Sequence, residues 1–133
     1  MTATEFINTI EEPRRSIIKA LRKSIIDNDK SVTEIVGKMM GKEMLIYNEK
    51  GIFKYALSSV KTHMSLHNMM IYGSPGMFNK FVEALPTAKF QKGCINFTTS
   101  EQMPPDIIAN LIADCAAVDY AKFFRDAYKS KKK

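Results

Sequence analysis

The chain lacks the features that mark several large classes of protein. It has only two cysteines, too few for a disulfide framework, which favours a reduced, cytoplasmic protein. No apolar run approaches the ~20 residues that a membrane-spanning helix needs, so we expect no membrane association. The opening segment, MTATEFINTIEE, has no basic stretch followed by an apolar one and does not predict a secretory signal. No glycine-rich nucleotide-binding pattern occurs.

Positive charge is concentrated at one end of the chain. The formal net charge of the 133 residues is +6, which by itself is compatible with a nucleic-acid partner. Four of the positive charges are lysines within residues 129–133, which leaves +2 for residues 1–128. The length and the 45% hydrophobic content suit one folded domain. We expect a single domain over residues 1–128 and a basic tail over 129–133, and nucleic acid is not an expected partner of the domain itself.

Helical spacing dominates the first third of the chain. Residues 4–10 predict a short helical turn, and the proline that opens residues 13–26 is typical of the first turn of a new helix. Apolar residues recur there at steps of three and four, which predicts an amphipathic helix. The hydroxyl of Ser31 and the carboxylate of Glu34 have the spacing of a capping box, which predicts another short helix over residues 31–36.

The middle of the chain has the two-residue period of strands. Residues 43–47, 52–57 and 60–67 predict three consecutive strands. Strand geometry places Lys54 and Tyr55 on opposite faces. In the third strand the more apolar set is Val60, Thr62, Met64 and Leu66, and the polar set is Lys61, His63, Ser65 and His67. This alternation predicts an antiparallel sheet that is covered on one face only.

The remaining segments complete the predicted fold. A Ser-Pro dipeptide at 74–75 predicts a helix start, residues 88–91 and 94–98 predict two strands, and a Pro-Pro dipeptide at 104–105 begins the last helix. The order is helices, three strands, helix, two strands, helix, without βαβ alternation. We therefore expect an α+β fold of two layers, in which N- and C-terminal helices cover one face of a mainly antiparallel sheet of about five strands.

The polar side of the predicted third strand carries the candidate binding residues. Lys61 and His63 offer donors for an anionic group, and Tyr47 and Tyr55 lie nearby if the register allows it. We predict these four as ligand-binding residues and expect no cofactor. The alternative is that they are ordinary solvent-facing strand residues.

A metal site is not predicted. His63 and His67 are the only histidines, and four residues along a strand span about 13 Å, too far for one ion with bonds of about 2 Å. The acidic residues are interleaved with basic ones, whereas hard cations favour clustered carboxylates. The methionines Met39, Met40 and Met44 have the chemistry for soft metals or greasy partners, but such residues are more often flexible core fillers.

Catalysis is not favoured, because a nucleophile must be held against a base and neither cysteine lies in a nucleophile-turn sequence. Cys115 falls on the apolar stripe of the last helix and is expected to be an inert core thiol, while Cys94 is on the other face of its strand. A C-terminal aromatic set has two interpretations, core packing or an exposed seam for a homodimer. It consists of Tyr120, Phe123, Phe124 and Tyr128.

Several motifs resemble the YdhG-like family of small bacterial domains of unknown function. The matching segments are 4–7 (TEFI), 11–15 (EEPRR), 51–67 (with KTHM inside it), 93–97 (GCINF) and 103–108 (MPPDII). In this family a Lys-x-His pattern recurs in the central hairpin. The likeness covers about residues 4–117, and it is carried by the order and spacing of the motifs. One departure is MGKE at residues 40–43, where relatives usually carry a Met-Pro-x-aromatic stretch.

The resemblance implies an α+β domain with helices from both termini over a sheet, and no established enzymatic activity. Some relatives are described as frataxin-like intracellular iron chaperones. From the resemblance and the candidate residues together, we expect a non-enzymatic module that binds a small anionic ligand or a protein partner. The alternatives are an iron chaperone and an oligomerising protein that uses the C-terminal aromatic stretch.

Overall fold

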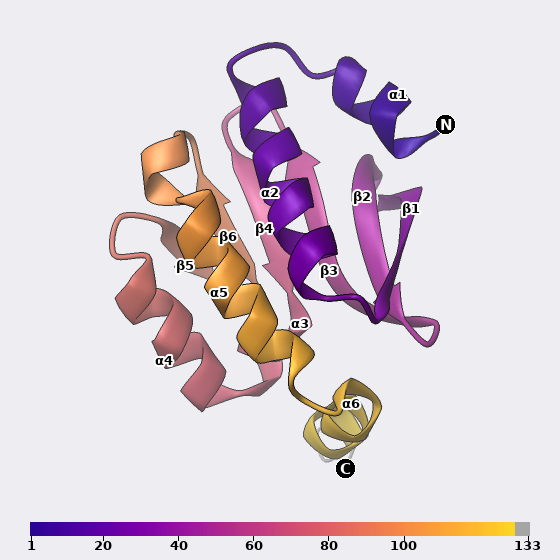
Figure 1. The fold of residues 1–133 in the computed structure, drawn as a ribbon, viewed down its shortest axis with the longest axis vertical. Coiled ribbons are helices and arrows are strands. Elements are labelled where there is room, and N and C mark those ends of the chain that lie inside the picture. Colours follow the sequence, from indigo (N-terminus) through magenta and orange to yellow (C-terminus); the bar gives the residue numbers. More distant parts are fainter. Residues whose placement is uncertain (130–133) are drawn as a thin grey trace.

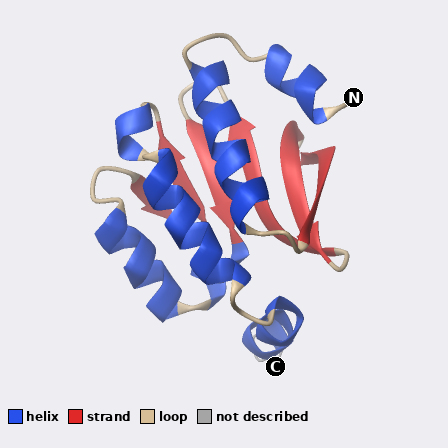
Figure 2. Ribbon diagram, in the orientation of Figure 1, coloured by secondary structure: helices blue, strands red, loops and turns tan. Residues whose placement is uncertain are grey.

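Residues 1–129 are described by a computed structural model in which helices lie over one face of a sheet (Figures 1 and 2). The strands are β1 (Val32–Met39), β2 (Lys42–Glu49), β3 (Ile52–Ser59), β4 (Met64–Asn68), β5 (Lys89–Gln91) and β6 (Cys94–Phe97). The helices are α1 (Ala3–Asn8), α2 (Arg14–Asn28), α3 (Met69–Gly73), α4 (Pro75–Ala84), α5 (Pro105–Ala116) and α6 (Tyr120–Lys129), with a 3-10 turn at Ser100–Gln102.

The sheet has six strands in the order β1-β2-β3-β4-β6-β5, and every pair is antiparallel. The predicted α+β class and the N- and C-terminal helices are confirmed, with one more strand than expected. Helices α2 and α5 pack against each other across the covered face. None of the helices described within residues 1–129 is long and apolar enough to cross a membrane.

Local caps start the helices where the sequence predicts them. The Thr2 hydroxyl accepts from the amide of Glu5, and the Glu5 carboxylate accepts from the amide of Thr2, a reciprocal capping box for α1. Helix α2 begins after Pro13, and α4 begins with Ser74 as its N-cap, whose hydroxyl accepts from the amide of Met77.

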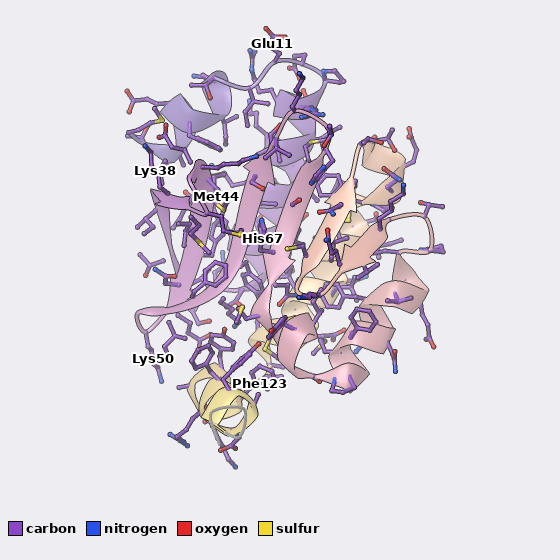
Figure 3. The ribbon with its side chains drawn as sticks, turned by 180° about the vertical axis from the view of Figure 1, so that it is seen from behind. Glu11, Lys38, Met44, Lys50, His67 and Phe123 are labelled. Carbon is purple, nitrogen blue, oxygen red and sulfur yellow. The ribbon has the colours of Figure 1, made fainter. Side chains whose placement is uncertain are left out.

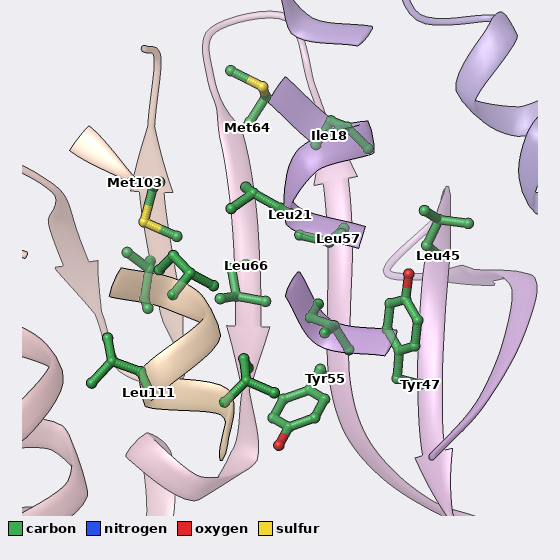
Figure 4. Packing of buried hydrophobic residues seen from close by; sticks show 14 of the residues in the cluster. Ile18, Leu21, Leu45, Tyr47, Tyr55, Leu57, Met64, Leu66, Met103 and Leu111 are labelled. Carbon is green, nitrogen blue, oxygen red and sulfur yellow. The ribbon is translucent and has the colours of Figure 1, made fainter. Parts of the chain in front are cut away.

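The main core lies between the helices and the sheet. Figure 4 shows Ile18 and Leu21 of α2 above Leu57 and Leu66 of the central strands, with Leu111 of α5 beside them. All but Leu111, which is 4% exposed, have no measurable exposure. Burial of such a leucine or isoleucine contributes about 1.5–3 kcal/mol, so this layer carries most of the stability of the fold.

The predicted helix over residues 31–36 is wrong, because this segment is strand β1. The Ser31 hydroxyl does not cap a helix; it donates to the carboxylates of Asp29 and Glu49 instead. The Glu34 carboxylate accepts from Arg22 of α2. The local sequence VTEIV is rich in β-branched residues, which pack well on a pleated surface, and all eight residues of β1 pair with β2. Long-range pairing therefore overrides the capping-box spacing.

The predicted third strand begins later than expected. Residues 60–63 form the turn before β4, closed by a hydrogen bond of 2.8 Å from the amide of Val60 to the carbonyl of His63. Arg14 of α2 donates to the carbonyl of Val60 and to the hydroxyl of Ser59, so the turn is tied to the helix layer. The predicted alternation holds from Met64 onward, since Met64 and Leu66 have 0% exposure and pack in the main core.

A bulge in β3 overturns the predicted faces of Lys54 and Tyr55. Tyr47 pairs with Tyr55 and Asn48 pairs with Phe53, so Lys54 is an extra residue without a partner on β2. Such a bulge places two successive side chains on one side of the sheet. Both Lys54 and Tyr55 therefore reach the covered face.

The C-terminal aromatic residues pack on their own chain rather than forming an exposed patch. Tyr120 is fully buried and donates to the carbonyl of Phe53, and Tyr128 donates to the carbonyl of Met69 over 2.7 Å. The ring of Phe123 lies so close to Gly73 that a Cβ there would be only 3.0 Å from it. Of the predicted basic tail, residues 130–133 lie outside the described residues.

Candidate functional site

The face of the sheet away from the helices, called here the open face, carries a row of side chains that changes from apolar to polar. The strand register aligns Ile35, Ile46, Ala56, His67, Cys94 and Gln91 from β1 to β5. Laterally paired residues point to the same side of a sheet. The β1–β3 half of the row is therefore apolar, and the β4–β5 half carries imidazole, thiol and amide groups.

A second row runs beside the first one and is polar on every strand that it crosses. The register aligns Ser58, Ser65, Asn96 and Lys89. The Ser65 hydroxyl donates to the side-chain carbonyl of Asn96 over 2.6 Å, and the Asn96 amide donates to Gln91 over 3.4 Å. These bonds orient the amide group of Asn96 before any ligand arrives.

Two adjoining hollows lie over these rows. The smaller, of about 230 Å³, is lined by Met40, Lys42, Met44, Ser58, Val60, His63, Ser65, His67, Gln91, Cys94 and Asn96. The larger, of about 450 Å³, is lined by Thr62, His63, Lys89, Asn96, Phe97, Thr98 and Gln102. His63 and Asn96 belong to both. Within the described residues, no carboxylate lines either hollow, whereas Lys42 and Lys89 do.

Cys94 and His67 meet in the smaller hollow. The Cys94 Sγ lies 3.0 Å from Nδ1 of His67, and the Ser58 hydroxyl lies 3.4 Å from the other ring nitrogen. Burial lowers the pKa of His67, and the neighbouring His63 lowers it further. Burial also raises the pKa of the Cys94 thiol. Both groups are therefore neutral near pH 7, unlike the thiolate–imidazolium pair of a cysteine nucleophile.

The structure separates the four residues predicted to bind a ligand. His63 lines both hollows, with its ring held by a 2.8 Å hydrogen bond to Thr62. Lys61 is exposed in the turn and lines neither hollow. Tyr47 and Tyr55 are fully buried on the covered face. The register does not bring the tyrosines near Lys61 and His63, because both tyrosines point into the core whereas Lys61 and His63 belong to the turn before β4. The role of Lys61 and His63 in ligand binding stays a prediction.

His67, Cys94 and Asn96 form a group that was not predicted from the sequence. Alternation already placed each of them on the face opposite the buried residues of its strand. Their meeting depends on the pairing of β4 with β6, which are separated along the chain by α3, α4 and β5. That pairing has no local signal in the sequence.

A second polar cluster lies on the covered face and is largely enclosed. The ammonium of Lys54 lies 2.7 Å from Asp29 and 2.7 Å from Glu49, and the side chains of Lys54 and Asp29 have 0% exposure. The Tyr55 hydroxyl donates to Asp29 over 2.8 Å. Within residues 1–129, no buried side-chain nitrogen or oxygen lacks a hydrogen-bond partner. Every buried polar atom of this cluster therefore already has a partner within the chain.

The acidic residues do not gather into a cation site. Within residues 1–129, no group of three or more His, Cys, Asp or Glu side chains is placed to hold a metal ion. Asp29 and Glu49 share Lys54, and Glu34 pairs with Arg22. Hard cations such as iron in a transport site favour clustered carboxylates, which the described part of the chain does not offer.

Comparison with protein-family models, curated proteins and solved structures found no match to this chain. The resemblance to the YdhG-like family stays a prediction.

Proposed function

We propose that this protein is a non-enzymatic binding module whose site is the pair of hollows on the open face, and that its ligand is a small anion. The observation that carries the proposal is the charge of the lining: Lys42 and Lys89 line the hollows, and no carboxylate of the described residues does. An anion placed there meets cations and hydrogen-bond donors without like-charge repulsion.

The size of the site is consistent with a small-molecule ligand. The larger hollow, about 450 Å³, falls within the range of about 300–1,000 Å³ that is usual for ligand pockets. Asn96 and His63 stand where the two hollows join, so a ligand that spans both would contact both residues. The neutral Cys94–His67 pair supports binding rather than nucleophilic chemistry.

A titration followed by NMR tests this proposal. Isotope-labelled protein is titrated separately with inorganic phosphate, citrate and a nucleoside monophosphate. We expect the side-chain resonances of His63 and Asn96 to move first and to saturate with at least one of these anions. If none of the three anions moves them, the proposal fails.

Charge variants sharpen the same experiment. Lys89→Gln and Lys42→Gln should each weaken the binding of the responding anion by about two- to fivefold, as expected for partly solvated ion contacts. The matched control is Lys61→Gln, which removes an exposed lysine that lines neither hollow. Equal weakening by the control would mean that only overall charge matters, and the site would be wrong.

The runner-up functions have less support. A frataxin-like iron chaperone would need an acidic surface, and the acids named above are neutralised by the chain's own cations. An oligomer that forms through the C-terminal aromatic residues would have to displace them from their present packing. We also propose a cytoplasmic location, supported by the two free thiols of Cys94 and Cys115.

A further inference from the structure

Cys94 and His67 line the smaller hollow of the proposed anion site, and they form a pair with a fixed geometry on which the charge argument for an anion does not depend. The two residues are register partners on neighbouring strands, and both are half-buried. Their Sγ and Nδ1 atoms lie 3.0 Å apart. Because both side chains rise from paired strands in the interior of the sheet, their approach does not depend on a loop.

Two thioethers line the same hollow. Met44 belongs to β2 and is only 2% exposed, so its side chain is held in place by its neighbours. Met44 and His67 both line this hollow on the open face, from strands on either side of β3 (Figure 3). Met40 stands in the β1–β2 turn and is 73% exposed, which leaves its side chain free to approach from solvent.

These donors select for a soft metal ion. Thiolate and thioether sulfur favour Cu(I), imidazole suits copper and zinc, and hard cations require oxygen ligands. No carboxylate of the described residues lines this hollow, so Mg²⁺ and Ca²⁺ lack their usual ligands. A structural zinc site needs four protein ligands from cysteine, histidine or carboxylate, and within residues 1–129 no group of even three such side chains is placed to hold a metal ion.

We propose that Cys94 and His67, with the thioether of Met44 as a third donor, bind a soft monovalent cation of the Cu(I) type. Metal bonds of about 2.3 Å to sulfur and about 2.0 Å to nitrogen, at a tetrahedral angle, place the two atoms about 3.5 Å apart. The present 3.0 Å separation between Sγ and Nδ1 has to widen by about 0.5 Å, which small side-chain rotations supply. Asn68, the residue after His67, is fixed by the start of α3, so His67 keeps its strand position.

Binding leaves the charge of the hollow unchanged. The thiol of Cys94 loses its proton to water, the thiolate takes up the cation, and His67 donates a nitrogen lone pair. Neither the metal nor the sulfur is oxidised or reduced. The site therefore stays compatible with an anion in the adjoining hollow, and the two proposals stand or fall separately.

The decisive experiment is an anaerobic competition for Cu(I) between the full chain and a chromophoric Cu(I) chelator. The wild-type protein should withhold one equivalent and develop an ultraviolet thiolate-to-copper charge-transfer band. Cys94→Ala and His67→Gln should each weaken the affinity by at least about tenfold, and Met44→Leu by a smaller factor. Cys115→Ala is the matched control, since that thiol is fully buried on the covered face and should leave the affinity unchanged.

Folding of each variant is checked by its thermal unfolding curve, and Cys94→Ser, which keeps the size of the side chain, serves as a second test of the sulfur. The proposal is overturned if the wild type and the Cys94 variants release copper to the chelator to the same extent. It is also overturned if Cys115→Ala, rather than the Cys94 variants, loses the affinity for Cu(I). Zn²⁺ at the same concentration should be held more weakly than Cu(I), and the reverse order would also overturn it. The response of His63 to anions should persist in Cys94→Ala, which separates this result from that of the anion proposal.

Discussion

The two polar clusters of this protein lie on opposite faces of the same sheet and differ in burial, charge and hydrogen bonding. The Lys54 cluster is covered by α6 and the end of α2, is charged, and has a partner for every buried polar atom. The Cys94–His67 cluster is neutral and half-buried beside a hollow. An enclosed charge must be fully paired, because an unpaired one is very unfavourable. Only the uncovered face can keep donors and acceptors available for a ligand.

From this difference we infer that the Lys54 cluster stabilises the fold and that the Cys94–His67 cluster takes part in binding. Asp29 follows α2, Glu49 ends β2 and Lys54 is the bulge residue of β3, so the enclosed ion pairs join the helix layer to the sheet. The ammonium of Lys54 also lies 5.1 Å from the ring centroid of Tyr120, the first residue of α6, so α6 contacts the same cluster. Three experiments can break or sharpen this contrast.

The largest effect is expected from Lys54→Met, which keeps the aliphatic bulk and removes the charge. Asp29 and Glu49 would remain buried beside each other without their cation, and breaking such a pair costs about 3–5 kcal/mol of unfolding free energy. Urea denaturation measures the loss. Lys61→Met, at an exposed turn position, should stay within about 0.5 kcal/mol of the wild type. A Lys54 variant as stable as that control would show that the enclosed cluster is not a structural element.

The next effect concerns the two thiols. Burial raises the pKa of Cys115 to about 11, and its side chain is fully enclosed, so it reacts only when the structure opens. Cys94 borders a hollow. We expect an aromatic disulfide reagent at pH 8 to modify Cys94 at least about a hundredfold faster than Cys115. The single-thiol variants Cys94→Ala and Cys115→Ala give the two rates separately, and comparable rates would contradict the assignment of the two faces.

The smallest effect is the dependence of stability on acid. Burial by itself would raise the pKa of Asp29, but hydrogen bonds from Lys54, Ser31 and Tyr55 outweigh it, so this pKa lies below its usual value. The resulting stabilisation is present above the unfolded pKa of about 3.9 and is lost as the pH falls through the lower folded pKa. Urea unfolding between pH 7 and pH 3 should show this loss.

The loss of unfolding free energy in acid is expected to be modest, because burial of Asp29 partly offsets the effect of its hydrogen bonds on the pKa. Asp29→Asn should be less stable at pH 7 and should show a weaker fall toward pH 3. If the variant and the wild type lose stability in parallel, the enclosed carboxylate is not the group that titrates.

Several elements were predictable because their signals are local. The cap at Ser74 and the break at Pro13 act within one helical turn, and the alternation of Met64 and Leu66 is a property of a single strand. These features need no knowledge of distant residues.

Two of the failures share one cause, which is that a distant partner decided the outcome. Ser31 has the spacing of a cap but bonds instead to Glu49, 18 residues away. Tyr55 faces the core together with Lys54 because β3 has one more residue than β2 where the two strands pair. Neither partner can be inferred from the neighbouring residues.

Local sequence signals were enough to predict the helices that begin near Pro13 and at Ser74, the alternation of Met64 and Leu66, and the α+β class, since these depend on steric and hydrogen-bonding preferences within a few residues. Only the tertiary structure decided that His67 meets Cys94, 27 residues further along, and that Lys54 meets Asp29, 25 residues before it. Strand pairing brings together residues that are far apart in the chain, and its free energy comes from the burial of whole faces rather than from any local pattern.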